Sequence, residues 1–192
     1  MNNYKVVLLG NSCVGKSSIT HRFVYNQFNS HTESTIGASY FKKKLIVDGK
    51  EIYLNVWDTA GASSRFSPLL PMYIRAAKLL LLVYDITNSE SFNKISSILL
   101  DVRKNMSTED MIVMLVGNKS DMENRMIMYE EGKSYAKQNN LLFMECSACT
   151  GENVLEIFNE VASLLVKKFP ITPISDSIIL KPDKKETSCC YK

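Results

Sequence analysis

Gly10-Asn11-Ser12-Cys13-Val14-Gly15-Lys16-Ser17 is the stretch that decides the fold of this chain. It follows a strand-like segment, 4–9, and precedes a helix-like segment, 17–25, in the pattern G-x-x-x-x-G-K-[ST]. Glycine lets the backbone turn so that successive N–H groups form a concave anion nest at a helix N-terminus. Lys16 is then placed to reach terminal phosphates, and the Ser17 hydroxyl to reach Mg²⁺. The stretch therefore predicts a phosphate-binding loop rather than a plain glycine turn, with binding residues Ser12, Cys13, Val14, Gly15, Lys16, Ser17 and Ser18.

The length and composition suit one domain with a tail. The chain has 192 residues, 45% of them hydrophobic, and a net charge of +3. We place the domain at 1–168 and a flexible tail at 169–192, where Pro170, Pro173 and Pro182 interrupt polar residues. The mild charge does not indicate nucleic acid as a partner. With no signal peptide and no apolar run near the roughly 20 residues that span a bilayer, we expect a cytosolic chain.

The five cysteines do not resemble a disulfide framework. Cys13 lies in the phosphate loop, and Cys146 and Cys149 flank the end of a late strand. None has metal-ligand spacing with His21 or His31, so a reduced compartment is expected.

Strand-like and helix-like segments alternate, which predicts βα units around a mostly parallel sheet. The turn Asp48-Gly49 joins two strand-like segments, so one antiparallel hairpin is expected at the sheet edge. Asn88 or Ser89 can cap a helix that runs to about residue 105, and 59–70 is expected to be a loop. Strands are expected at 4–9, 39–47, 51–58, 79–84, 111–116 and 141–145, and helices at 17–25, 89–105, 129–138 and 153–168.

Two further motifs stand where strands end, which is where open α/β sheets bind ligands. In Asp58-Thr59-Ala60-Gly61 the carboxylate suits Mg²⁺, and the Gly61 N–H is placed for a γ-phosphate. In Asn118-Lys119-Ser120-Asp121, the Asp121 carboxylate is suited to accept hydrogen bonds from guanine N1–H and N2–H₂, a donor pair that adenine lacks. Ser147-Ala148 is expected to add a backbone N–H to guanine O6. A capping turn is the alternative for the second motif, and the three motifs in this order argue against it.

With these motifs the chain resembles the Rab family of Ras-superfamily small GTPases over 4–168. The likeness also includes Trp57, 72–77 and 83–88 with Ser91-Phe92. It implies a P-loop NTPase small G domain: an α/β fold with a six-stranded, mostly parallel sheet, one antiparallel edge strand and helices on both faces. It implies that GTP, GDP and Mg²⁺ are bound, that Phe28 lies over guanine, and that Thr35 senses Mg²⁺ and γ-phosphate. Implied metal ligands are Ser17, Thr35 and Asp58, and implied catalytic residues are Lys16, Thr35 and Gly61; Asn118, Lys119, Asp121, Ser147 and Ala148 complete the nucleotide site.

The resemblance also implies partners and a location. Tyr40, Trp57 and Tyr73 match an aromatic triad that contacts effectors, with ordinary core aromatics as the alternative. Exchange factors and GTPase-activating proteins would act on the two switches of a monomeric domain. The match leans toward the endocytic Rabs, so the cytoplasmic face of endosomal or vesicular membranes, with cycling through the cytosol, is expected.

One position departs from the family pattern. After Gly61 the family has a glutamine that orients the attacking water, whereas this chain has Ala62-Ser63-Ser64-Arg65. The glutamine maps to Ala62 or Ser63, and neither side chain can replace it. We therefore expect the intrinsic hydrolysis rate to be lower by about 10², while nucleotide binding stays intact. A timed switch and a constantly GTP-bound scaffold both remain open, while a nucleotide kinase is disfavoured by the guanine motif.

The chain ends in Cys189-Cys190-Tyr191-Lys192, which resembles the double-cysteine ending on which Rabs are geranylgeranylated. Two isoprenoids anchor a protein stably, whereas one holds it marginally. The resemblance implies a prenyl transferase and a membrane as partners, with free thiols on a frayed end as the alternative. Lys181, Lys184 and Lys185 would add attraction to anionic lipid.

Overall fold

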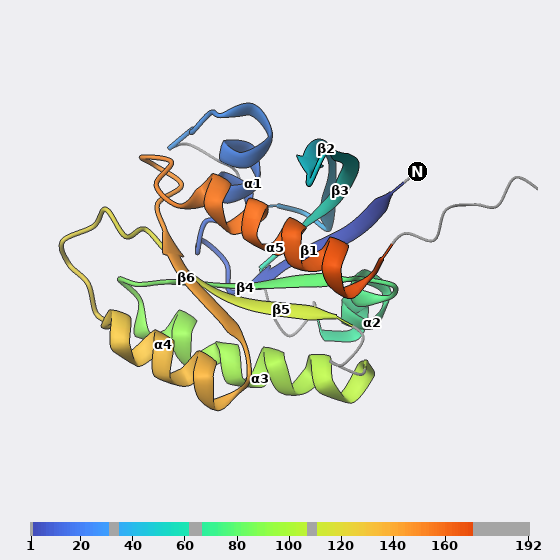
Figure 1. Cartoon of the computed structure of the whole chain (residues 1–192). Helices are drawn as coiled ribbons and strands as arrows, with labels where there is room; N and C mark the ends of the chain where they lie inside the picture. The colour runs from blue at the N-terminus through green and yellow to red at the C-terminus, as the bar shows by residue number, and fades with distance from the viewer. Residues whose placement is uncertain (1, 31–34, 62–66, 107–110, 171–192) are drawn as a thin grey trace, which may run out of the picture.

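The computed structural model describes residues 2–30, 35–61, 67–106 and 111–170 as an α/β domain (Figure 1). The strands are β1 (Asn3–Gly10), β2 (Ala38–Val47), β3 (Lys50–Thr59), β4 (Leu79–Asp85), β5 (Ile112–Asn118) and β6 (Leu142–Cys146). The helices are α1 (Lys16–Tyr25), α2 (Leu70–Ile74), α3 (Ser89–Asn105), α4 (Tyr129–Gln138) and α5 (Val154–Lys168), with a 3₁₀ helix, η1, at Ser67–Leu69.

The strands form a six-stranded sheet in the order β2-β3-β1-β4-β5-β6. β2 pairs antiparallel with β3, and the other neighbours pair parallel, which confirms the predicted sheet and its antiparallel edge. Asp48 and Gly49, with φ of 50° and 74°, make the predicted hairpin turn between β2 and β3. The strand order reverses at β1, so the carboxyl end of β1 borders the crevice where such sheets bind ligands.

The predicted loop at 59–70 is wrong at both ends. Thr59 still belongs to β3, and a helical segment, η1 followed by α2, begins at Ser67. Pro71 lies in the first turn of α2, where its missing N–H costs no hydrogen bond. Leu70 and Ile74 are buried against the sheet, so packing stabilises a helix too short for its periodicity to be recognised.

The ends of β4 and β5 also differ from the prediction. Both strands continue to polar residues, since Asp85 pairs with Asn118 in the parallel ladder. The apolar runs end earlier, at Tyr84 and Val116, which is why the sequence pattern predicted shorter strands. The helix over 89–105 is confirmed, and its N-cap is Asn88, whose Oδ1 accepts from the Ser91 N–H at 3.0 Å.

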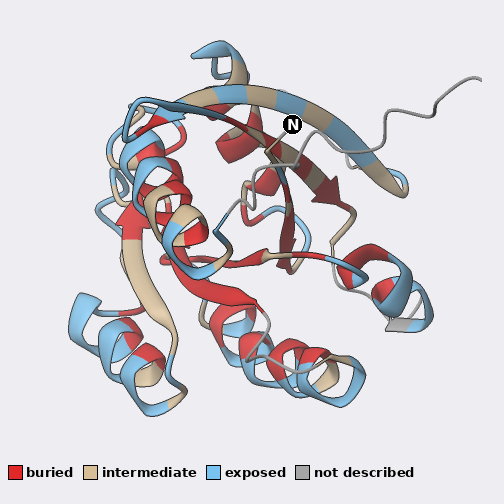
Figure 2. Cartoon of the chain, turned by 45° about the vertical axis from the view of Figure 1, so that its right-hand side comes forward, coloured by how far each residue is buried: buried red, intermediate tan, exposed pale blue. Residues whose placement is uncertain are grey.

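Two hydrophobic cores lie on opposite faces of the sheet (Figure 2). α1 and α5 cover one face, where the Phe23 and Phe158 rings stack with centroids 3.7 Å apart. α2, α3 and α4 cover the other face. Because successive strand residues point to opposite faces, Leu81 packs in the first core and Leu82 in the second. The predicted helices on both faces are thus confirmed.

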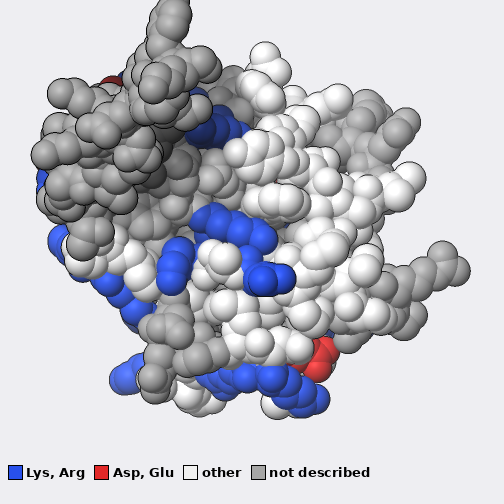
Figure 3. Space-filling model, turned by 90° about the vertical axis from the view of Figure 1, so that its right-hand side faces the viewer, with Lys and Arg blue, Asp and Glu red and all other residues white. Residues whose placement is uncertain are grey.

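α5 ends on a basic side of the molecule. Lys and Arg side chains gather there, and few Asp or Glu side chains are visible among its described residues (Figure 3). The Lys78 and Lys168 ammonium groups lie 4.4 and 5.7 Å from the Phe169 ring centroid, and Lys5 Nζ donates to the Arg75 carbonyl at 3.0 Å. In the described part of the chain, no helix is long and apolar enough to cross a bilayer.

Candidate nucleotide-binding site

The glycines of the phosphate loop are required by close contacts. A Cβ on Gly10 would lie 2.1 Å from the Val83 carbonyl oxygen, and a Cβ on Gly15 would lie 2.2 Å from Asn118 Nδ2. Gly15 has a φ of 94°, in the left-handed region that favours glycine. These contacts seat the loop directly on the ends of β4 and β5.

Lys16 is buried beneath the loop, with 5% of its surface exposed. Its Nζ donates to the carbonyls of Gly10 at 3.1 Å and Asn11 at 2.8 Å. Burial lowers the pKa of the Lys16 ammonium to about 8, because desolvation disfavours the charged form more than Asp58 favours it. An anion at the loop would restore the lost stabilisation of that charge.

The three predicted metal ligands meet at one point. Ser17 Oγ donates to Asp58 Oδ2 at 2.6 Å and lies 2.9 Å from Thr35 Oγ1. Asp58 Oδ1 is buried and has no hydrogen-bond partner among the described residues. Burial raises the pKa of the Asp58 carboxyl, and the Ser17 hydrogen bond only partly opposes that rise. An all-oxygen set with one unsatisfied carboxylate oxygen fits Mg²⁺, which binds hard oxygen ligands.

Asn118 connects the phosphate loop to the loop after β6. Its Nδ2 donates to the Val14 carbonyl at 2.8 Å, and its Oδ1 accepts from the Ala148 N–H at 3.1 Å. Both backbone N–H groups of the Ser147-Ala148 pair, one of which was predicted to reach guanine O6, therefore donate within the protein, since the Ser147 N–H donates to the Glu152 carbonyl at 3.0 Å. Ser147 is fully buried, and its Oγ accepts from the Thr150 N–H at 3.0 Å.

An ion pair positions the lysine of the second strand-end motif. Lys119 Nζ lies 2.6 Å from Asp85 Oδ2, and Asp85 Oδ1 accepts from the backbone N–H and the hydroxyl of Thr87. Asp85 is 6% exposed, so its carboxylate is fixed by the core. Asp121, two residues beyond Lys119, is exposed at the cavity wall, where its oxygens can accept hydrogen bonds from a ligand.

Most of these groups line one cavity of about 640 Å³, whereas the Asp58 and Asp85 side chains support it from behind and are not part of its lining. Among the predicted nucleotide-binding residues, Val14 and Ser147 do not line it. Six residues line it without having been predicted to bind nucleotide: Asn29, Ser30, Thr59, Ala60, Met122 and Cys149. Its walls are formed by Ser12, Cys13, Gly15, Lys16, Ser17, Ser18, Phe28, Asn29, Ser30, Thr35, Thr59, Ala60, Gly61, Asn118, Lys119, Asp121, Met122, Ala148 and Cys149.

The predicted aromatic triad is divided between surface and core. Tyr40 is 53% exposed, and its ring meets Trp57 edge-on with centroids 5.7 Å apart. Tyr73 is 6% exposed and packs in the core on the α2 and α3 face. The structure therefore places Tyr40 and Trp57 side by side and buries Tyr73.

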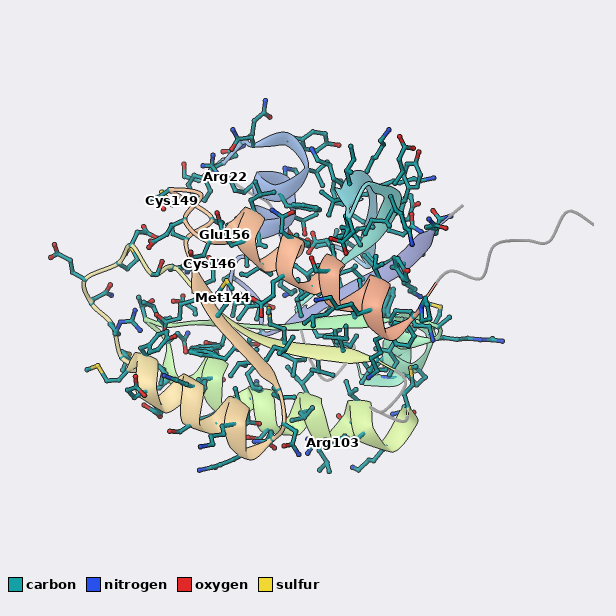
Figure 4. The ribbon with its side chains drawn as sticks, in the orientation of Figure 1. Arg22, Arg103, Met144, Cys146, Cys149 and Glu156 are labelled. Carbon is teal, nitrogen blue, oxygen red and sulfur yellow. The ribbon has the colours of Figure 1, made fainter. Side chains whose placement is uncertain are left out.

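Sequence reasoning missed two residues that support the site. Asp85 gave a local signal, an acidic residue at the end of an apolar strand, which could have indicated its role. Arg22 gave none, because its partners Ala148 and Cys149 lie more than a hundred positions away. Figure 4 shows Arg22 beside Cys149, where α1 meets the loop after β6.

Several predictions fall outside the described residues. Ala62 and Ser63, which replace the glutamine, and Cys189 and Cys190, the expected lipidation sites, all lie there. Cys13, Cys146 and Cys149 are free, and Cys146 is buried. Across the described ranges, no cluster of three or more His, Cys, Asp and Glu side chains could hold a metal ion.

Comparisons with known proteins agree with this geometry. The Ras family model matches residues 5–167, nearly all of the domain. The Ras-related protein RHN1 of Nicotiana plumbaginifolia is 40% identical over 192 aligned residues, which cover 98% of this chain and 95% of that protein. The chain therefore belongs to the Ras family of small GTPases, and within it to the Rab group.

Proposed function

We propose that this protein is a Mg²⁺-dependent GTP/GDP switch of membrane traffic with slow intrinsic GTP hydrolysis, anchored to membranes by its C-terminal cysteines. The observation that carries the proposal is the single cavity that joins the phosphate loop to the Asn118–Asp121 motif. A nucleotide spanning it would place phosphates at Lys16 and the base at Asp121. Small GTPases as a family bind and hydrolyse GTP, so the proposal concerns how this chain does so and where.

At the phosphate end, the loop N–H groups and Lys16 would neutralise the β- and γ-phosphates. Ser17, Thr35 and Asp58 would hold Mg²⁺, which when bound stabilises the charge of the phosphate oxygens. Gly61 lies against the loop, since a Cβ there would come within 2.5 Å of the Ser12 nitrogen. Its N–H is therefore near enough to the phosphates to respond to the γ-phosphate, together with Thr35.

At the base end, Asp121 would accept two hydrogen bonds from guanine, and the Ala148 N–H, which donates to Asn118 Oδ1, would share its hydrogen with O6. Phe28, 39% exposed at the cavity wall, would cover one face of the ring. The Asp85 carboxylate supports this end by holding Lys119. Selectivity for guanine follows because adenine lacks the donor pair that Asp121 requires.

The slow hydrolysis rests on Ala62 and Ser63, since neither side chain can orient a water as glutamine does. A partner that supplies the missing group would turn the switch off. Without one, the protein would hold GTP and present Tyr40 and Trp57 constantly to effectors. The missing glutamine is the observation that favours this scaffold function as the second candidate.

Membrane association is supported by the two C-terminal cysteines and by the basic side on which α5 ends (Figure 3). Prenylation of Cys189 and Cys190 by a prenyl transferase would anchor the tail. The basic side, together with Lys181, Lys184 and Lys185 of the tail, would favour the anionic cytoplasmic leaflet of endosomal or vesicular membranes. Effectors, an exchange factor and a GTPase-activating protein would act on the monomeric domain at its two switches.

Single-turnover phosphate release from GTP-loaded protein, with and without Mg²⁺, tests the proposal. Bound GTP that is hydrolysed slowly, and only with Mg²⁺, is the expected result. Release at the usual family rate would contradict slow hydrolysis, whereas failure to retain GTP would contradict the switch itself. GTP retained without measurable hydrolysis would favour the scaffold.

A further inference from the structure

Arg22 is the only described residue on α1 whose side chain bonds to the loop after β6. Its Nε donates to the Ala148 carbonyl at 3.0 Å, and its Nη2 donates to the Cys149 carbonyl at 2.6 Å. The two bonds use the planar fork of the guanidinium, which matches two adjacent oxygens. Arg22 forms no ion pair with a described carboxylate, so the guanidinium is held by hydrogen bonds to backbone carbonyls.

The same guanidinium also holds the end of α1. Arg22 Nη1 donates to the Asn26 carbonyl at 3.2 Å, and Asn26 caps the helix with a left-handed φ of 55°. Phe28, which lines the cavity, follows two residues later. One side chain thus joins the segment that carries Phe28 to the loop that carries the Ala148 N–H.

These bonds close a circuit around the base end of the cavity. Ala148 bonds to Asn118, Asn118 bonds to Val14, and the loop containing Val14 leads into α1, which carries Arg22. Arg22 itself does not line the cavity. It can therefore affect the nucleotide only through the walls that it joins.

From this geometry we infer that Arg22 is a positioning residue of the guanine site, which sets the spacing between the Phe28 segment and the 148–149 loop. The inference rests on the proposed binding of guanine nucleotides and goes beyond it. Losing Arg22 lets both walls relax, so GDP and GTP dissociate faster by the same factor. The phosphate end keeps its Mg²⁺ dependence, because none of the Arg22 bonds reaches Ser17, Thr35 or Asp58.

The test compares R22M and R22K with a matched control, R103M. Arg103 donates to the Asn139 carbonyl at 2.9 Å, and it lies on the far side of the molecule from Arg22 (Figure 4). Methionine keeps a long unbranched stem without donors, and lysine keeps the charge without the fork. Release of a fluorescent GDP derivative is measured in Mg²⁺ and in EDTA, alongside the melting temperature of the GDP-saturated protein.

We expect R22M to release GDP about tenfold faster than the wild type, because the 148–149 loop loses its hydrogen bonds from a charged donor. The same factor should appear in Mg²⁺ and in EDTA, with R22K intermediate and R103M unchanged. The inference would be overturned if R22M released GDP at the wild-type rate, or if R103M accelerated release as much as R22M does. It would also be overturned if the acceleration in R22M disappeared in EDTA. Wild-type protein that retains no guanine nucleotide would instead contradict the proposed function, so the two failures are distinguishable.

Discussion

Ser17 Oγ donates a 2.6 Å hydrogen bond to Asp58 Oδ2, which joins the first turn of α1 to the end of β3. The other oxygen, Asp58 Oδ1, is buried without a described partner. Replacing Asp58 by Asn keeps the shape and removes the negative charge. We expect D58N to lose the slowing of nucleotide release by Mg²⁺, because a neutral amide oxygen binds the cation weakly.

Release of labelled GDP in Mg²⁺ and in EDTA measures this difference. Asp101, a half-exposed carboxylate on α3 that pairs with Lys104, offers D101N as a matched loss of charge away from the site. D101N should keep the full Mg²⁺ effect. Protection of GDP by Mg²⁺ in D58N at the wild-type level would show that Asp58 does not hold the ion.

Lys16 links nucleotide binding to proton uptake. Burial lowers the pKa of its ammonium to about 8, and a bound phosphate would raise that pKa again by favouring the charged form. The bound state therefore holds more protons than the free state at and above pH 8, so affinity falls as the pH rises through that range and is level below it.

Calorimetry of GDP binding in buffers with different ionisation heats measures the uptake. We expect a fraction of a proton to be taken up near pH 8, where free Lys16 is half protonated, and less at about pH 7, where it is mostly charged already. If the affinity for GDP rose with pH above about pH 8, protons would be released on binding, which would contradict a charged, buried Lys16 at the phosphates.

Much of the site was predictable from local patterns. Gly10 to Ser17, Asp58 and Asn118 stand at strand ends in fixed order, and a parallel sheet brings such ends to one edge. The alternation of strand-like and helix-like periods predicted a sheet with helices on both faces, and the two hydrophobic cores confirm that arrangement. α2 escaped prediction, because a five-residue helix shows too little period to separate it from a proline-containing loop.

The parts that could not be predicted depend on contacts between distant residues. Arg22 and Ala148 meet only because α1 and the loop after β6 pack together, and no spacing along the chain reveals it. Burial of Tyr73 likewise depends on how α2 lies against α3. Sequence pattern indicates which residues carry chemistry, whereas tertiary packing decides which residues orient them.

Asp121 is expected to determine the choice of base. In D121N the amide can donate to a carbonyl at position 2 of the base but cannot accept two hydrogen bonds. We therefore expect GDP affinity to fall by about 100-fold, equivalent to roughly 3 kcal/mol, and affinity for xanthosine diphosphate to rise. Competition of GDP and of xanthosine diphosphate against labelled GDP measures both affinities. Unchanged preference for GDP would place the base elsewhere, while D101N again controls for lost charge.

The two C-terminal cysteines are expected to control membrane binding. A chain carrying both C189S and C190S should stay in the soluble fraction of cells that prenylate proteins, whereas the wild type should partition to membranes. The single variants should bind marginally, since one chain anchors weakly. C149S is the control, because Cys149 is an exposed thiol of the domain and not of the tail. Equal partitioning of the wild type and the double variant would exclude prenyl anchoring.

Restoring a glutamine after Gly61 should restore hydrolysis. Ala62 and Ser63 are the two positions to which the family glutamine aligns, so A62Q and S63Q are compared singly. The variant that orients the attacking water should accelerate single-turnover phosphate release by about 10², or roughly 3 kcal/mol of barrier, while the other stays near wild type. S64Q, one residue further along, controls for glutamine in the same segment. If the wild type already matches the best variant, another group orients the water; if none of the three accelerates release, glutamine is not what limits the rate, and the scaffold function gains support.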